Sequence, residues 1–216
     1  MKRFVPVIAL VIAAVVLGAV NATAFAYRWI QGTVTVAEPT AARGAACVGF
    51  YSSSTQSGIS PTYLPEAGTN HNAQTYSTNT ISVTTGQVVC QWTVGRTTYS
   101  LYEGITVNVP ITVGSWYIKD FYGFGYYGGT TGTTYVYIKV EQPIVGPITV
   151  ANLTLYKANT NTKVATVDLK SGTITGPITL NPGDALQLDL FINATAETTA
   201  KFKVGFYVSQ KQEAPR

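Results

Sequence analysis

Apolar and polar residues alternate with a period of two through almost the whole chain after residue 27. A β-strand needs this pattern when one of its faces packs on a core and the other meets water. The clearest apolar rows are Val136, Ile138 and Val140; Leu186, Leu188, Leu190 and Ile192; and Phe202, Val204, Phe206 and Val208. No stretch has a convincing helical period, so the sequence predicts an all-β fold.

Turn signals divide these rows into about ten short strands, a number typical of a β-sandwich or jelly roll. Pro110 interrupts the row over residues 105–113, which predicts an edge strand or a bulged strand there. The apolar phase also switches near Ala151, which predicts a β-bulge. No tryptophan lies between Cys47 and Cys90, which argues against an immunoglobulin domain.

Residues 1–26 have the pattern of an export signal. Lys2 and Arg3 precede an apolar run over residues 4–20, and residues 24–26 match the A-x-A shape that signal peptidases accept. We expect Sec-type export to the cell surface, with cleavage after Ala24 or Ala26. The segment is also long enough to be an uncleaved membrane anchor, but Pro6 and the small residues favour removal.

A short alternating strand follows the signal at once, with a link to the body over residues 27–39. Its apolar face holds Ile30, Gly32, Val34 and Val36. A strand at a free chain end can pair with a sheet edge, either its own or a neighbour's. The sequence therefore predicts a signal over residues 1–26, a protruding strand over residues 27–39, and a jelly-roll-like β-sandwich over residues 40–216.

Composition limits the function classes. Loss of Lys2 and Arg3 with the signal lowers the net charge from +4 to +2, and no run of basic residues remains, so no nucleic-acid partner is predicted. Charged residues make up only 11% of the chain, while Thr, Gly, Tyr and Val are abundant. Such a surface suits an extracellular wall or fibre.

Cys47 and Cys90 are the only cysteines, and in an exported protein such a pair predicts one disulfide. Cys90 shares a strand face with Val88 and Trp92, so its sulfur should point into the core. Closing this loop is worth about 4 kcal/mol in the chain-entropy model. Two buried thiols are the alternative. A metal site with the sole histidine, His71, is disfavoured, and no cofactor is expected.

Five aromatic residues and five glycines occur within residues 121–132. One interpretation is a flexible loop over the end of the sandwich. The other is an aromatic contact patch for a second subunit or a sugar, because tyrosine supplies contact area at low entropic cost. The predicted patch comprises Tyr122, Phe124, Tyr126 and Tyr127.

Catalytic motifs are missing from the sequence. It contains no G-x-S-x-G, no H-E-x-x-H and no phosphate-binding or dinucleotide-binding fingerprint. A Ser-His-Asp triad would depend on His71, which lies in a polar loop. The acidic residues are scattered singly, and no pair stands out for glycoside hydrolysis. We therefore predict that the chain is not an enzyme.

Two acceptor sequences for N-glycosylation lie beyond the signal, beginning at Asn152 and Asn193. Asn193 is out of phase with Leu188 and Ile192, so it is expected to face solvent. Asn152 lies at the phase switch and could point either way.

Several of these features occur together in one known group of proteins. They are the signal ending at residues 24–27, the strand over residues 30–36, an L-N-P-G-D turn at residues 180–184, and the strands over residues 186–192 and 201–208. In these the chain resembles the bacterial TasA and camelysin biofilm-fibre proteins and the related archaeal bundling pilins. The Tyr- and Thr-rich composition is most similar to that of the archaeal pilins.

The resemblance implies a jelly-roll subunit that polymerises by donating its N-terminal strand to a groove in the next subunit. Its partners would be identical subunits and neighbouring fibres, and its role would be cell–cell adhesion and biofilm formation. Proteolysis, described for the camelysin branch, is not implied, because the zinc-binding motif is missing. The alternative is a monomeric secreted or wall-associated module that binds glycans through Tyr122, Tyr126 and Tyr127.

Overall fold

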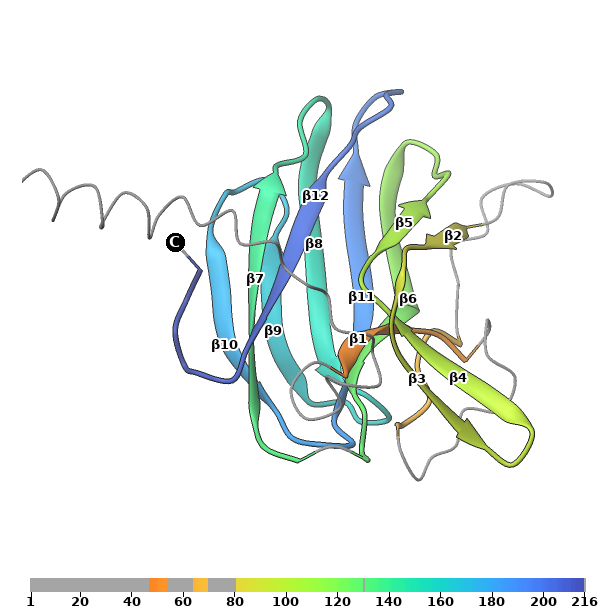
Figure 1. Ribbon diagram of the computed structural model, residues 1–216. Coiled ribbons are helices and arrows are strands. Elements are labelled where there is room, and N and C mark those ends of the chain that lie inside the picture. The colour runs from red at the N-terminus through yellow and green to blue at the C-terminus, as the bar shows by residue number, and fades with distance from the viewer. Residues whose placement is uncertain (1–46, 54–63, 70–80, 130, 216) are drawn as a thin grey trace, which may run out of the picture. The chain divides into compact units, whose positions relative to one another are not determined.

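The computed structural model describes residues 47–53, 64–69, 81–129 and 131–215. These residues form strands, turns and loops without a helix, which confirms the predicted all-β class (Figure 1). Accordingly, this described part contains no helix that could cross a membrane. The predicted signal over residues 1–26, the strand with Ile30, Gly32, Val34 and Val36, and His71 all lie outside the described residues.

The strands are β1 (Val48–Tyr51), β2 (Ser82–Thr85), β3 (Val88–Val94), β4 (Thr97–Tyr102), β5 (Ile105–Asn108), β6 (Gly114–Tyr126), β7 (Thr134–Gln142), β8 (Ile148–Lys157), β9 (Lys163–Asp168), β10 (Ile174–Leu180), β11 (Ala185–Ala194) and β12 (Lys203–Ser209). A seven-stranded sheet has the order β3-β4-β1-β6-β11-β8-β9. A three-stranded sheet has the order β10-β7-β12, and β2 pairs with β5. Every pair is antiparallel.

The main core lies between the seven-stranded and three-stranded sheets, which makes the domain a β-sandwich. The inner face of β11 supplies the predicted row from Leu186 to Ile192, and none of its four apolar members is more than 6% exposed. The predicted row on β7, from Val136 to Val140, is buried in the same core. Each such side chain contributes about 1.5–3 kcal/mol when it is fully buried.

The phase switch in β8 is a β-bulge, as predicted. Asn193 pairs with Val150 and Ala194 pairs with Ile148, so Thr149 is the inserted residue. The bulge shifts the in/out alternation of the following residues by one position. Ala151 is therefore buried, and Asn152 lies on the outer face of the sheet.

The predicted aromatic contact patch is wrong for three of its four residues. Tyr122 and Tyr126 are 0% exposed and Phe124 is 2% exposed, because β6 runs through this stretch and places all three in the main core. The intervening Gly123 and Gly125 face a second layer, where Ala67 and Leu64 would lie 2.6 and 2.7 Å from an added Cβ. The glycines therefore allow close packing against this second layer and do not form a flexible loop.

The fourth residue of the predicted patch, Tyr127, is half-buried and stacks on Trp92 with a ring-centroid distance of 4.4 Å. Both rings belong to the second, smaller core on the outer face of the seven-stranded sheet. The predicted disulfide between Cys47 and Cys90 is confirmed and lies in this core. It joins β3 to the residue that precedes β1.

The predicted strand over residues 105–113 is shorter than expected. β5 ends at Asn108, two residues before Pro110, which has no N–H to donate to a ladder. Residues 109–113 instead form one wall of the groove described next.

Candidate acceptor groove

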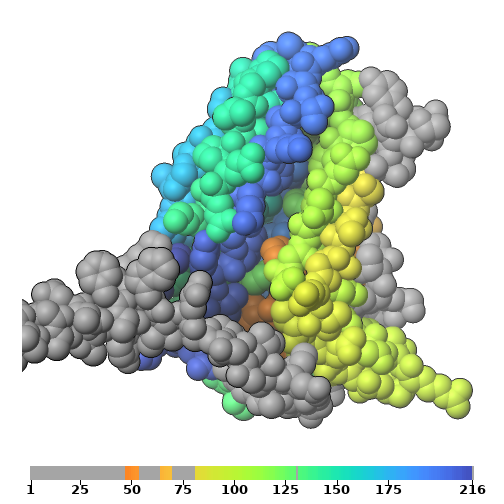
Figure 2. All heavy atoms as spheres, turned by 45° about the horizontal axis from the view of Figure 1, so that its top comes forward, coloured from red at the N-terminus to blue at the C-terminus, as the bar shows by residue number. Residues whose placement is uncertain are grey.

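The two sides of the sandwich differ in how the sheets meet. On the closed side, β9 lies against β10, and the inward residues Val167 and Leu180 are 0% and 2% exposed. On the open side, β12 and β5 do not pair with each other. Figure 2 shows a hollow between the blue β12 and the yellow-green strands, with orange atoms of β1 visible at its bottom.

The inward row of β12 is half-exposed along the open side. Val204 and Phe206 are half-buried, and Val208 is 40% exposed. Their direct partners on β7 are the residues of the buried row, which are at most 2% exposed. Because both rows share one face of one sheet, the difference arises on the far side of β12, where no described strand lies beside it.

The opposite wall of the groove is also apolar and half-covered. Ile105 and Val107 on β5 and Val83 on β2 pack against the main core but remain partly exposed. Three rings form the floor: Phe50 and Phe124 lie 4.9 Å apart between centroids, and Phe206 lies 5.0 and 4.8 Å from them. The groove between β12 and β5 thus exposes apolar side chains that no strand among the described residues covers.

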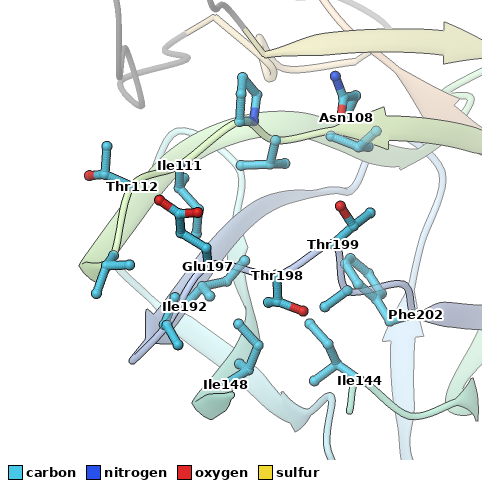
Figure 3. Close-up of a pocket in the computed structure, with 17 residues that line it drawn as sticks. Asn108, Ile111, Thr112, Ile144, Ile148, Ile192, Glu197, Thr198, Thr199 and Phe202 are labelled. Carbon is cyan, nitrogen blue, oxygen red and sulfur yellow. The ribbon is translucent and has the colours of Figure 1, made fainter. Parts of the chain in front are cut away.

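The groove widens at one end into a cavity of about 460 Å³ between residues 107–113 and 196–202. In Figure 3, Ile144 and Ile148 lie below this cavity, and Phe202 lies at its right side. Glu197 and Thr198, from the segment that leads into β12, lie between Ile111 and Ile148 in this view. Most residues that line the cavity are aliphatic, but Glu197 and three threonines also line it, so its surface is mixed.

Both walls have backbone groups available for pairing. Within the described ranges, β12 pairs only with β7, and β5 pairs only with β2. An unpaired strand edge presents N–H and C=O groups that favour the addition of another strand. The groove therefore offers hydrogen bonds as well as apolar contacts.

A polar cluster holds β12 to β7 from the outside of the three-stranded sheet. The Nζ atom of Lys203 lies 2.8 Å from the Oε2 atom of Glu141, and the Tyr207 hydroxyl donates a hydrogen bond to Oε1. Hydrogen bonds from Lys203 and Tyr207 lower the pKa of the Glu141 carboxyl, and the same carboxylate raises the pKa of Lys203. The cluster fixes one edge of β12 while its other edge faces the groove.

A second polar cluster, on the outer face of the seven-stranded sheet, has a structural explanation. Asp189 is 1% exposed and accepts hydrogen bonds from the Asp120 N–H at 2.9 Å, from Gln187 Nε2 at 2.7 Å and from the Tyr117 hydroxyl. Burial and this carboxylate raise the pKa of Tyr117. The Asp120 carboxylate in turn accepts the Gly68 N–H at 2.7 Å. These bonds close a bulge in β6 and attach residues 64–69 to it.

The structure brings only some of the predicted site residues into the groove. Phe124 forms part of its floor, whereas Asn152 and Asn193 lie on the outer face of the seven-stranded sheet. The sequence identified the β12 row as inward-facing but did not show that this row would border a groove with no described strand beside it. Among the described residues, no three His, Cys, Asp or Glu side chains gather as metal ligands.

Comparison with protein-family models and with curated proteins found no match for this chain. The groove and the clusters around it are thus the observations that bear on function.

Proposed function

We propose that this chain is the structural subunit of an extracellular fibre that polymerises by donor-strand complementation. The groove between β12 and β5 would receive the strand over residues 30–36 of the next subunit. One observation carries the proposal: an inward apolar row on β12 is half-exposed beside a fully buried row on β7. A sandwich that lacks one strand has this property, and leaving such an edge open invites pairing.

The donor strand and the groove match in length and period. The inward row next to the groove has apolar residues at the four alternate positions 202, 204, 206 and 208. The N-terminal strand has Ile30, Gly32, Val34 and Val36 at the same spacing. Residues 30–36 would span about 20 Å if they form a strand, which is close to the length of β12 (Lys203–Ser209). Ile30, Val34 and Val36 would each contribute about 1.5–3 kcal/mol on full burial.

Such an exchange generates a filament. Each subunit would give one strand and take one, so the interface is heterologous and does not close on itself. The confirmed disulfide fits an oxidising, extracellular setting. The resemblance to the TasA, camelysin and archaeal bundling-pilin group supports the same assembly, with cell–cell adhesion and biofilm formation as its role.

Two of the three tyrosines predicted for the glycan-binding alternative are fully buried. Tyr122 and Tyr126 are 0% exposed, so neither ring is available to a ligand. Tyr127 is half-buried and stacks on Trp92. The three tyrosines predicted for glycan binding therefore do not support a monomeric sugar-binding module.

Mixing two assembly-defective variants of the mature protein tests the proposal. Val34→Asp removes the donor, because a carboxylate in an apolar groove costs several kcal/mol. Val208→Asp blocks the acceptor and leaves the donor intact. We expect neither variant alone to form fibres. Mixed together, they should form dimers and stop there, since the Val208→Asp chain can donate only to the Val34→Asp groove.

Matched controls separate assembly from folding. Thr33→Asp lies next to Val34 in sequence but on the polar face of the strand. Val164→Asp lies on β9, where Val164 is 40% exposed, as is Val208. Both controls should form fibres as wild type does. Electron microscopy and mass photometry give the readouts, and fibres of normal length from either defective variant, or a mixture without dimers, would refute the proposal.

A further inference from the structure

The outer face of the seven-stranded sheet carries two asparagines in its interior. Asn152 lies in the middle of β8 and Asn193 near the end of β11, and both side chains are half-exposed. The bulge at Thr149 directs Asn152 outward, which the sequence left open. Each asparagine begins an N-x-T acceptor sequence for N-glycosylation.

The two asparagines are diagonal neighbours. β8 and β11 are adjacent and antiparallel; Asn193 pairs with Val150, and Asn152 pairs with Phe191. Residues in such register share one face of the sheet and lie within reach of each other. The two acceptor amides therefore belong to one surface patch.

Local packing does not explain these asparagines. Asparagine is depleted in strands because its side chain competes with the backbone for hydrogen bonds. Within the part of the chain that the structure describes, neither amide side chain makes a hydrogen bond; Thr149 bonds only the backbone carbonyl of Asn193. Two amide nitrogens are thus free on an accessible face.

Aromatic side chains flank the Asn152 site. Phe191 pairs with Asn152 on one side and with Tyr117 on the other, so the three residues form a row across β8, β11 and β6. Phe191 is half-buried and Tyr117 is 46% exposed. The hydrogen bond from the Tyr117 hydroxyl to Asp189 holds that ring in place. Such rings present an apolar surface on which the C–H face of a sugar can pack.

We propose that Asn152 and Asn193 both carry N-linked glycans and that the Asn152 glycan lies across Phe191 and Tyr117. In the modification, the amide Nδ2 forms a bond to the anomeric carbon of a lipid-linked oligosaccharide. The bond from that carbon to the phosphate oxygen breaks, the lipid phosphate leaves, and the amide loses one proton to solvent. An oligosaccharyltransferase acting on the exported chain would catalyse this step without any oxidation or reduction.

The glycans would hydrate a surface that is poor in charge, since charged residues make up only 11% of the chain. They would also leave the groove free, because the sugar-bearing face of β8 and β11 points away from the core that β12 and β5 flank. The inference does not depend on whether the chain forms fibres.

Peptide mapping of the protein purified from its own cells tests the sites directly. Trypsin places Asn152 in the peptide 140–157 and Asn193 in the peptide 171–201, so the two sites are read separately by tandem mass spectrometry. We expect both peptides to carry a sugar chain that fragments stepwise back to the asparagine. An unmodified form as the main species of either peptide overturns the proposal.

A double-mutant cycle tests the aromatic platform. Phe191→Ala should lower the melting temperature of the glycosylated protein by about 2–4 °C more than it does in an Asn152→Gln background, where the sugar is missing. Phe191→Ala in an Asn193→Gln background serves as the control and should behave as in the wild type. Equal shifts in the wild-type and Asn152→Gln backgrounds would show that the sugar does not pack on Phe191.

Discussion

The closed and open sides of the sandwich use the same kind of residue with different outcomes. On the closed side, Val167 on β9 and Leu180 on β10 are buried because the two sheets meet there. On the open side, Val204 and Phe206 on β12 have equally apolar side chains and face the same core, yet they remain half-exposed. The difference lies in the neighbouring strand, not in the row itself.

The two sides therefore differ in what covers their apolar residues among the described strands. On the closed side, β9 and β10 of the same chain cover the apolar residues, so these residues stabilise the subunit. The open side leaves apolar surface and backbone edges without cover from described residues, and under the proposed assembly a donated strand would bury the part that is still exposed. We therefore expect substitutions on the closed side to act on folding and those on the open side to act on assembly.

The largest expected effect separates two matched valines. Val167→Asp buries a carboxylate in the closed side, where Val167 is 0% exposed, and should destabilise the subunit by about 4 kcal/mol or more. Val208→Asp, at a position that is 40% exposed, should change the stability of the isolated subunit by less than about 1 kcal/mol. Thermal unfolding of donor-deficient subunits followed by circular dichroism measures both. Similar losses of subunit stability in the two variants would contradict the proposed difference between the closed and open sides.

A second prediction concerns the disulfide that joins β3 to the start of β1. The disulfide closes a sequence separation of 43 residues, and its removal by the pair Cys47→Ser and Cys90→Ser should cost about 4 kcal/mol at most. Because the bond ties β3 to the start of β1, the loss of amide protection should concentrate in these strands, while β8 and β9 should keep theirs. Hydrogen exchange with oxidised wild type as the reference checks this. Uniform loss across all strands would contradict a local role.

The smallest expected effect lies at the edge of β12. Lys203 and Tyr207 lower the pKa of Glu141 in the folded chain, so this carboxyl adds stability above its unfolded pKa and loses it as the pH falls through the folded value. Wild type should therefore melt slightly above Glu141→Gln at pH 7, and the difference should vanish well below pH 4. Melting temperature against pH gives the test, with the exposed Glu213→Gln as control. A difference that persists in acid would assign the effect to something other than the Glu141 charge.

Much of the fold was predictable because alternation is a local property. The rows on β7 and β11, the bulge in β8 and the disulfide all followed from the spacing of residues along one strand or from the number of cysteines. The aromatic stretch differs from its prediction for a physical reason. Alternating Tyr, Gly, Phe and Gly fits a loop by composition. It also fits a strand with aromatic side chains on one face and glycines on the other, where a second layer packs closely on the backbone. The sequence alone does not show that a second layer exists.

Outside the aromatic stretch of β6 and the phase switch in β8, the sequence by itself determined which residues point inward, because a strand's side chains alternate whatever surrounds it. Only the tertiary structure decided which of those inward residues are covered. Burial depends on the order of strands in each sheet and on which edges meet, and these are set by contacts between segments far apart in the chain. For that reason Val167 and Val208 look alike in the sequence and differ in the fold: one side of the sandwich is closed by β9 and β10, and the other ends at β12.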